Sequence, residues 1–343
     1  MKTIKLSIIT FFALIFFNSC SDNPILLKTV ILAEISNPHE IISDDNHLII
    51  SDGIEGTSIY VYDLEELSLI SQFGGTGDSI GKFIVSGGHE VDMDIRNDTL
   101  LISSHWKMSF FTKKGELLKE QPIKYDTYGY SYLGGQYQGS DDITINDNMY
   151  YSFNIYDKEF NFKKEITRIA SMNQGEHGLQ MLVRRYQGIT FNEKFYFKGK
   201  SEDFEIEIYD SNGAKYGAIS HDYERIPVSE EHRNSIYKLY KEHPLFGQFF
   251  EQIKHRFVFP DYLPAIYNFN IADEFIYALT YESDSINSVL YKFNIDGKLS
   301  EKLYVPLNWK NATEIFPYTV SGNRLYQLVK NKSEKWELQI IKL

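Results

Sequence analysis

Asn46-His47-Leu48-Ile49-Ile50 decides the fold, because its pattern of polar residues followed by a short apolar strand occurs six times. Four of the five spacings between successive segments are about 45 to 52 residues, the length of a four-stranded repeat unit. The remaining spacing, about 81 residues, indicates an insertion. The other five segments are Asp98-Thr99-Leu100-Leu101-Ile102, Asn148-Met149-Tyr150-Tyr151-Ser152, Glu193-Lys194-Phe195-Tyr196-Phe197, Glu274-Phe275-Ile276-Tyr277-Ala278 and Asn323-Arg324-Leu325-Tyr326-Gln327.

Each segment is flanked by further strand-like stretches, so we interpret it as the second strand of its unit. An inner strand precedes it, as at residues 90–95, and a third strand follows it, as at residues 206–210 and 290–295. The third strands end in Asn212-Gly213 and Asp296-Gly297, dipeptides that favour tight hairpin turns because they tolerate positive φ. A fourth, outer strand completes each unit.

The two ends of the chain predict how the units form a ring. The sequence finishes at residues 336–343, the third strand of the sixth unit, and one spare strand lies at residues 28–35. Placed as the outer strand of the last unit, the early strand leaves no sheet incomplete and no blade face uncovered. The predicted fold is therefore an all-β, six-bladed β-propeller closed by an N-terminal strand.

The long spacing predicts a small helical insertion at about residues 227–264, between blades four and five. Ser229-Glu230-Glu231 resembles a helix N-cap with an acidic first turn, and Ile236, Leu239 and Tyr240 recur at helical spacing. Such a connection lies on the face that carries the channel mouth. A lid over the channel and a helical pair packed on the blade edges both fit this pattern.

The N-terminus predicts export and lipidation. Lys2 and Lys5 precede a short apolar run at residues 8–17, which is too short to span a bilayer. Cys20, the only cysteine, follows this run directly and is the predicted lipidation site. We therefore expect a lipoprotein signal peptide at 1–19, a tether at 20–27 and the propeller at 28–343. The predicted location is the bacterial envelope, as an outer-membrane lipoprotein of either leaflet.

Together these features resemble the six-bladed propeller lipoproteins of Bacteroidetes, which are described as TolB-like or NHL-like. The glycine-rich stretch at residues 73–83 and the proline-bounded stretch at 259–264 are similar to inter-blade segments of that family. The first departs from the usual pattern by lacking Pro and Glu near its end. The resemblance covers nearly the whole mature chain and implies a fold rather than an activity.

Charge and motifs exclude several classes of function. The formal net charge is −12, without a basic stripe to offset it, so the sequence argues against nucleic-acid binding. The glycines at 75–81 do not have the GxGxxG spacing of a nucleotide-binding loop. The sequence also contains no HExxH, GxSxG or paired CxxC motif. No catalytic constellation is therefore assigned, and whether the chain is an enzyme stays open.

One column of polar residues emerges when the six units are aligned. Its members stand six positions before each repeat segment and are Glu40, Asp92, Asp142, Gln187, Asn268 and Pro317. Inner strands surround the channel of a propeller, so this column predicts a polar ring near the channel mouth. Such a ring could bind a polar ligand, hold Ca²⁺ through Glu40, Asp92, Asp142 and Asn268, or be polar for solvation alone.

Two further residues, Trp106 and Arg185, are expected on the same face as the channel mouth and would suit a carbohydrate or peptide. The leading hypothesis is an envelope-anchored binding module for a polar ligand or an envelope protein, with membrane contact only through the lipid. The alternative is a metal-dependent hydrolase or lyase of the sugar-lactonase type, with a cation in the channel.

Overall fold

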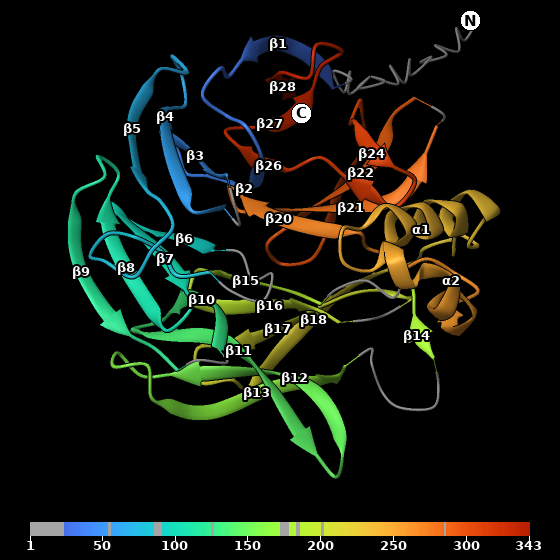
Figure 1. Cartoon of the computed structure of the whole chain (residues 1–343), viewed down its shortest axis with the longest axis horizontal. Helices are drawn as coiled ribbons and strands as arrows, with labels where there is room; N and C mark the ends of the chain where they lie inside the picture. The colour runs from blue at the N-terminus through green and yellow to red at the C-terminus, as the bar shows by residue number, and fades with distance from the viewer. Residues whose placement is uncertain are drawn as a thin grey trace, which may run out of the picture.

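The computed structural model describes residues 24–53, 56–85, 91–124, 127–171, 178–182, 186–199, 202–284 and 286–343. Six four-stranded antiparallel sheets surround a central axis, so the six-bladed propeller is confirmed (Figure 1). In blades one to five the first strand lies innermost and the chain runs outward through consecutive hairpins, whereas in blade six β26 (Tyr318–Ser321) is innermost and β1 (Ile25–Ile31) is the outer strand. Among the described residues, no helix is long and apolar enough to cross a membrane.

The first three blades are built from consecutive strands. Blade one contains β2 (Pro38–Ser43), β3 (His47–Asp52), β4 (Ser58–Asp63) and β5 (Leu69–Gly74). Blade two contains β6 (Asp92–Arg96), β7 (Thr99–Ser104), β8 (Lys107–Thr112) and β9 (Leu117–Pro122). Blade three contains β10 (Thr127–Leu133), β11 (Gln136–Ile145), β12 (Asn148–Tyr156) and β13 (Phe162–Ala170).

The other three blades complete the circle. Blade four contains β15 (Gln187–Phe191), β16 (Lys194–Lys198), β17 (Phe204–Asp210) and β18 (Lys215–His221). Blade five contains β20 (Asn268–Ala272), β21 (Phe275–Ser283), β22 (Ser288–Asn294) and β23 (Leu299–Val305). Blade six contains β26 (Tyr318–Ser321), β27 (Arg324–Lys330), β28 (Trp336–Lys342) and β1 (Ile25–Ile31).

The ring is closed by the N-terminal strand, as the sequence predicts. β1 pairs antiparallel with β28, from Ile25 opposite Lys342 to Ile31 opposite Glu337 (Figure 1). The strand begins at Ile25, earlier than the expected start at Lys28, so Ile25 and Leu26 belong to the sheet rather than to the tether. Closure therefore joins the two ends of the folded chain through backbone hydrogen bonds.

The apolar core is divided among the junctions between neighbouring blades. Within the described residues, six clusters of buried side chains each join two adjacent blades, and a seventh lies under the helical insertion. At the closure, Leu48 and Ile50 of blade one contact a cluster that includes Leu338 and Ile340 of blade six. Each blade is thus stabilised mainly by its two neighbours, which explains why an incomplete ring would be costly.

The insertion lies between β18 and β20, between blades four and five when blade one starts at β2. If counting starts instead at the blade that contains β1, the same insertion lies between blades five and six. Its elements are α1 (Glu230–Glu242), a 3₁₀ turn at Gly247–Phe249, α2 (Phe250–Ile253), a 3₁₀ turn at Lys254–Arg256 and β19 (Phe257–Val258). β19 pairs with β14 (Leu179–Gln180), and a short hairpin, β24 (Trp309–Asn311) with β25 (Glu314–Ile315), precedes blade six.

Candidate functional site

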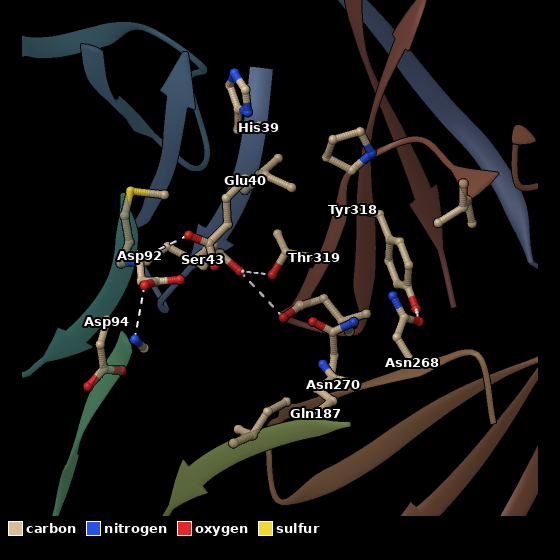
Figure 2. A pocket seen from close by; sticks show the side chains of 18 of the residues that line it. His39, Glu40, Ser43, Asp92, Asp94, Gln187, Asn268, Asn270, Tyr318 and Thr319 are labelled. Atoms are coloured by element: carbon tan, nitrogen blue, oxygen red, sulfur yellow. Dashed lines mark hydrogen bonds between the residues drawn. The ribbon is translucent and has the colours of Figure 1, made fainter. Parts of the chain in front are cut away.

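A cavity of about 800 Å³ occupies the centre of the ring and is lined by the inner strands of all six blades. The aligned position contributes Glu40, Asp92, Gln187 and Asn268, together with Gly129 and Pro317. Figure 2 shows that Glu40, Asp92 and Asp94 lie on one side of the cavity, while Asn268, Asn270 and Tyr318 lie on the other. The structure therefore brings four predicted site residues together at one channel.

Asp142 does not lie at the channel, so its assignment to an inner strand was wrong. It lies on β11, the second strand of blade three, and its side chain is exposed. The segment at 148–152 belongs to β12, the third strand of blade three, so the sequence pattern marked the wrong strand in this blade. The missed signal is Gly134-Gly135, which turns β10 into β11 and places Gly129 at the aligned position.

The remaining predicted residues lie elsewhere or outside the described part of the chain. Trp106 occupies the turn between β7 and β8 with a φ of 62°, and its side chain is 48% exposed. Its ring is tilted by 60° against that of His105, with the centroids 4.8 Å apart, and it is not among the residues that line the cavity. Arg185 and Cys20 lie outside the described residues. Binding by Trp106 and Arg185 stays a prediction.

The carboxylates of blades one and two bind backbone amides of the next blade. Glu40 accepts a hydrogen bond from the Met93 amide through Oε2 at 3.2 Å, which joins β2 to β6. Asp92 accepts the Gly129 amide through Oδ2 at 2.9 Å, which joins β6 to β10. These bonds stabilise the junctions and hold one oxygen of each carboxylate in a structural role.

The amide side chains on the opposite side make equivalent bridges. Gln187 of β15 donates to the Phe269 carbonyl and accepts the Phe269 amide, both at 2.8 Å. Asn268 of β20 accepts the Tyr318 hydroxyl, and Ser43 of β2 contacts the Thr319 hydroxyl at 3.1 Å. The polar ring therefore consists largely of side chains that link neighbouring inner strands, a role that the sequence analysis did not anticipate.

Asp94 also lines the cavity, although the alignment did not identify it. It stands two positions after Asp92 on β6, and therefore on the same face of the strand. Its Oδ2 accepts the Tyr132 amide at 2.9 Å. Burial raises the pKa of Asp94 to about 6, while hydrogen bonds from the Tyr132 and Ile95 amides act in the opposite direction. The alternation of β6 alone could have identified this residue.

Negative charge predominates in the cavity lining. The carboxylates are Glu40, Asp92, Asp94 and Glu314, against Lys310 and the titratable His39. Lys310 forms an ion pair with Glu314 at 3.1 Å, and His39 contacts the Gly53 carbonyl through Nε2 at 2.8 Å. The interior is therefore polar and acidic, which disfavours anionic ligands.

A cation site is not assembled from the predicted ligands. Asp142 lies away from the cavity, and Glu40 and Asp92 each bind a backbone amide. Across the described residues, no group of three or more His, Cys, Asp or Glu side chains could hold a metal ion.

The helical insertion lies beside the cavity rather than in its wall. Within the described lining, no residue comes from 227–264. Instead, Ile236 and Leu263 pack with Met181 and Leu182 of the connection that leads to blade four. Of the two interpretations drawn from the sequence, this arrangement favours a helical unit packed on the blade edges.

The fold and its central cavity define a six-bladed β-propeller with a polar channel. No protein-family model and no curated protein matches the sequence. Among solved structures, the chain is similar to a DUF4221 family member from Bacteroides vulgatus ATCC 8482, with 10% identity and a TM-score of 0.52. That match covers 93% of this chain and 98% of the other.

A second similar structure is the β-propeller domain of Myceliophteria thermophila Cps50 (Swd1), with 10% identity and a TM-score of 0.44. It covers 93% of this chain and 99% of that chain. At this identity, the similarity to the Bacteroides protein shows the fold alone.

Proposed function

We propose that this chain is a binding module whose central channel holds a small polar ligand that is neutral or positively charged. The observation that carries the proposal is the cavity of about 800 Å³, lined by polar side chains from all six blades. This volume lies within the range of small-molecule sites in proteins. The cross-blade hydrogen bonds hold the lining in place before a ligand arrives, which lowers the entropic cost of binding.

The lining chemistry supports a carbohydrate or a peptide with a free amino group. Asn268, Asn270 and Gln187 present amide groups, and Thr190 and Thr319 present hydroxyls. Such groups hydrogen-bond to sugar hydroxyls and peptide amides, while the carboxylates of β2 and β6 would attract an ammonium group. A phosphate or sulfate group would meet a negative wall.

The location that we propose is the bacterial envelope, with Cys20 as the lipidated residue. The charged and apolar N-terminal pattern that ends at this single cysteine supports this proposal. A hydrolase or lyase that uses a channel cation would need Asp142 beside Glu40 and Asp92, and no observation favours that second function.

The proposed ligand class can be tested by thermal-shift and calorimetric titration. The probes are neutral oligosaccharides, amino sugars, short peptides and their sulfated or phosphorylated counterparts. We expect neutral or cationic probes to raise the Tm and anionic counterparts to have no effect.

Two matched variants locate the site. Asn270→Phe fills the channel and should abolish binding, whereas Asp142→Phe places the same side chain on exposed β11 and should leave binding unchanged. Binding of anionic probes alone, or binding that survives Asn270→Phe, would contradict the proposal.

A further inference from the structure

We propose that the helical insertion is a membrane-docking element that inserts apolar side chains into an anionic lipid surface. The sequence predicts membrane contact only through the lipid on Cys20, so this surface would be a second contact and goes beyond ligand binding in the channel. The docking tip is defined as Leu245, Phe246 and Phe249, which follow α1. The argument uses exposure, backbone hydrogen bonding and charge.

The base of the insertion is firmly packed. Ile236 of α1 is buried in a cluster with Met181 and Leu263, and the Tyr237 ring lies parallel to Phe257 at a centroid distance of 5.9 Å. Ser229 caps α1, and its hydroxyl accepts the His232 amide at 3.3 Å. The insertion therefore presents its tip from a rigid support.

The tip is exposed although it is strongly apolar. Leu245 is 67% exposed, and Phe246 and Phe249 are each 47% exposed. The insertion lies at the periphery of the molecule, at the right-hand edge of the view beside blade five (Figure 1). Three large apolar side chains within five residues of a peripheral segment form a patch of the kind that marks an interaction surface.

The backbone amides of the tip already have hydrogen-bond acceptors within the insertion, as burial in an apolar medium requires. The Leu245 and Phe246 amides both donate to His243 Nδ1, at 3.1 and 3.2 Å. The Gly247 amide donates to the His243 carbonyl at 2.8 Å, and the Phe249 amide donates to the Phe246 carbonyl at 2.9 Å. These donors are satisfied internally, so the tip can leave water without leaving them unpaired.

Charge identifies the surface as anionic. Over the whole insertion, 227–264, five Lys or Arg are balanced by five Asp or Glu, but Glu230 and Glu231 open α1 and Asp261 follows β19. Between them, residues 233–258 contain five Lys or Arg and two Glu, so the basic excess lies around the tip. Three of these cations are exposed: Lys238, Lys241 and Arg256. Lys254 forms an ion pair with Glu251, with 2.6 Å between Nζ and Oε2. Apolar side chains flanked by exposed cations fit the interface of a bilayer that contains anionic lipids. The tip is a projecting segment rather than a groove, which favours a lipid surface over a protein partner.

The test uses a chain that starts at Ser21, which contains every strand of the ring and lacks the lipidated cysteine. Co-sedimentation is measured with vesicles of phosphatidylglycerol and phosphatidylcholine in equal parts, and with vesicles of phosphatidylcholine alone. We expect salt-sensitive binding to the first and none to the second. The triple variant Leu245→Ser, Phe246→Ser, Phe249→Ser should lower the partition coefficient on the order of 100-fold.

Two controls separate docking from misfolding. Leu118→Ser changes an exposed leucine on β9, across the ring from the insertion in Figure 1, and should leave binding unchanged. Phe246→Trp should show a blue-shifted emission on binding to the anionic vesicles. No binding of the native tip, equal binding to both vesicle types, or full binding by the folded triple variant would overturn the proposal. So would capture of an acidic envelope protein by the tip in place of lipid binding.

Discussion

At the scale of single residues, the side chains at the channel serve the ring itself. Glu40, Asp92, Gln187 and Asn268 each bond to the neighbouring inner strand rather than standing free in the channel. Their position could be predicted from the sequence, because the strand repeat fixes it. Their hydrogen bonds to the next blade could not be predicted from the sequence, since these bonds depend on the relative orientation of neighbouring blades.

Asp92 offers a direct test of this structural role. Asp92→Ala removes the acceptor of the Gly129 amide, and we expect it to lower the free energy of unfolding by about 1–3 kcal/mol. Asp98→Ala, in the exposed turn between β6 and β7, should change it by less than about 0.5 kcal/mol. Urea unfolding of both variants measures the difference, and equal effects would refute the role given to Asp92.

Asp94 predicts a pH dependence of stability. Its pKa is raised to about 6 in the folded chain, above the ordinary value of 3.8, so the folded state binds more protons within this range. The contribution of Asp94 to stability must therefore fall as pH rises through about 4 to 6, and this loss stays constant above the folded pKa. Relative to the native chain, Asp94→Asn should gain on the order of 1–2 kcal/mol at pH 7 and little at pH 4. Melting curves across this range test the sign, and a difference that does not vary with pH would contradict it.

At the scale of elements, blade three shows where the sequence misled. β10 contains an irregularity between Tyr128 and Ser131, where Gly129 adopts a φ of 60° and donates its amide to Asp92 instead of to β11. The polar-then-apolar pattern survives in β12 but has no counterpart at the start of β11. In the other five blades the pattern and the second strand coincide, so the inner strands could be located there.

The helical insertion yields a prediction for a single capping residue. Ser229 accepts the His232 amide, and His232 returns a contact to the Ser229 amide at 3.0 Å. Ser229→Ala should weaken α1 by about 1 kcal/mol. Hydrogen exchange should then speed up within α1 while the six sheets keep their protection. Uniform acceleration across the chain would show instead that α1 unfolds only with the whole ring.

At the scale of the whole molecule, ring closure should dominate stability. Deleting residues 1–31 removes β1, exposes the edge of β28 and uncovers part of the cluster that joins blades six and one. We expect a lower Tm and concentration-dependent aggregation, measured by calorimetry and light scattering. A chain that starts at Ser21 keeps β1 and serves as the control. Equal behaviour of the two truncations would show that closure contributes little.

The pairing of β1 with β28 also bears on when the protein can fold. Of the strands in the ring, β1 is synthesised first and its partner β28 last. Contacts so distant along the chain form slowly, because the intervening loop must first be closed. β1 therefore stays without its partner strand until β28 has been synthesised. A chain interrupted before β28 is complete could not close the ring.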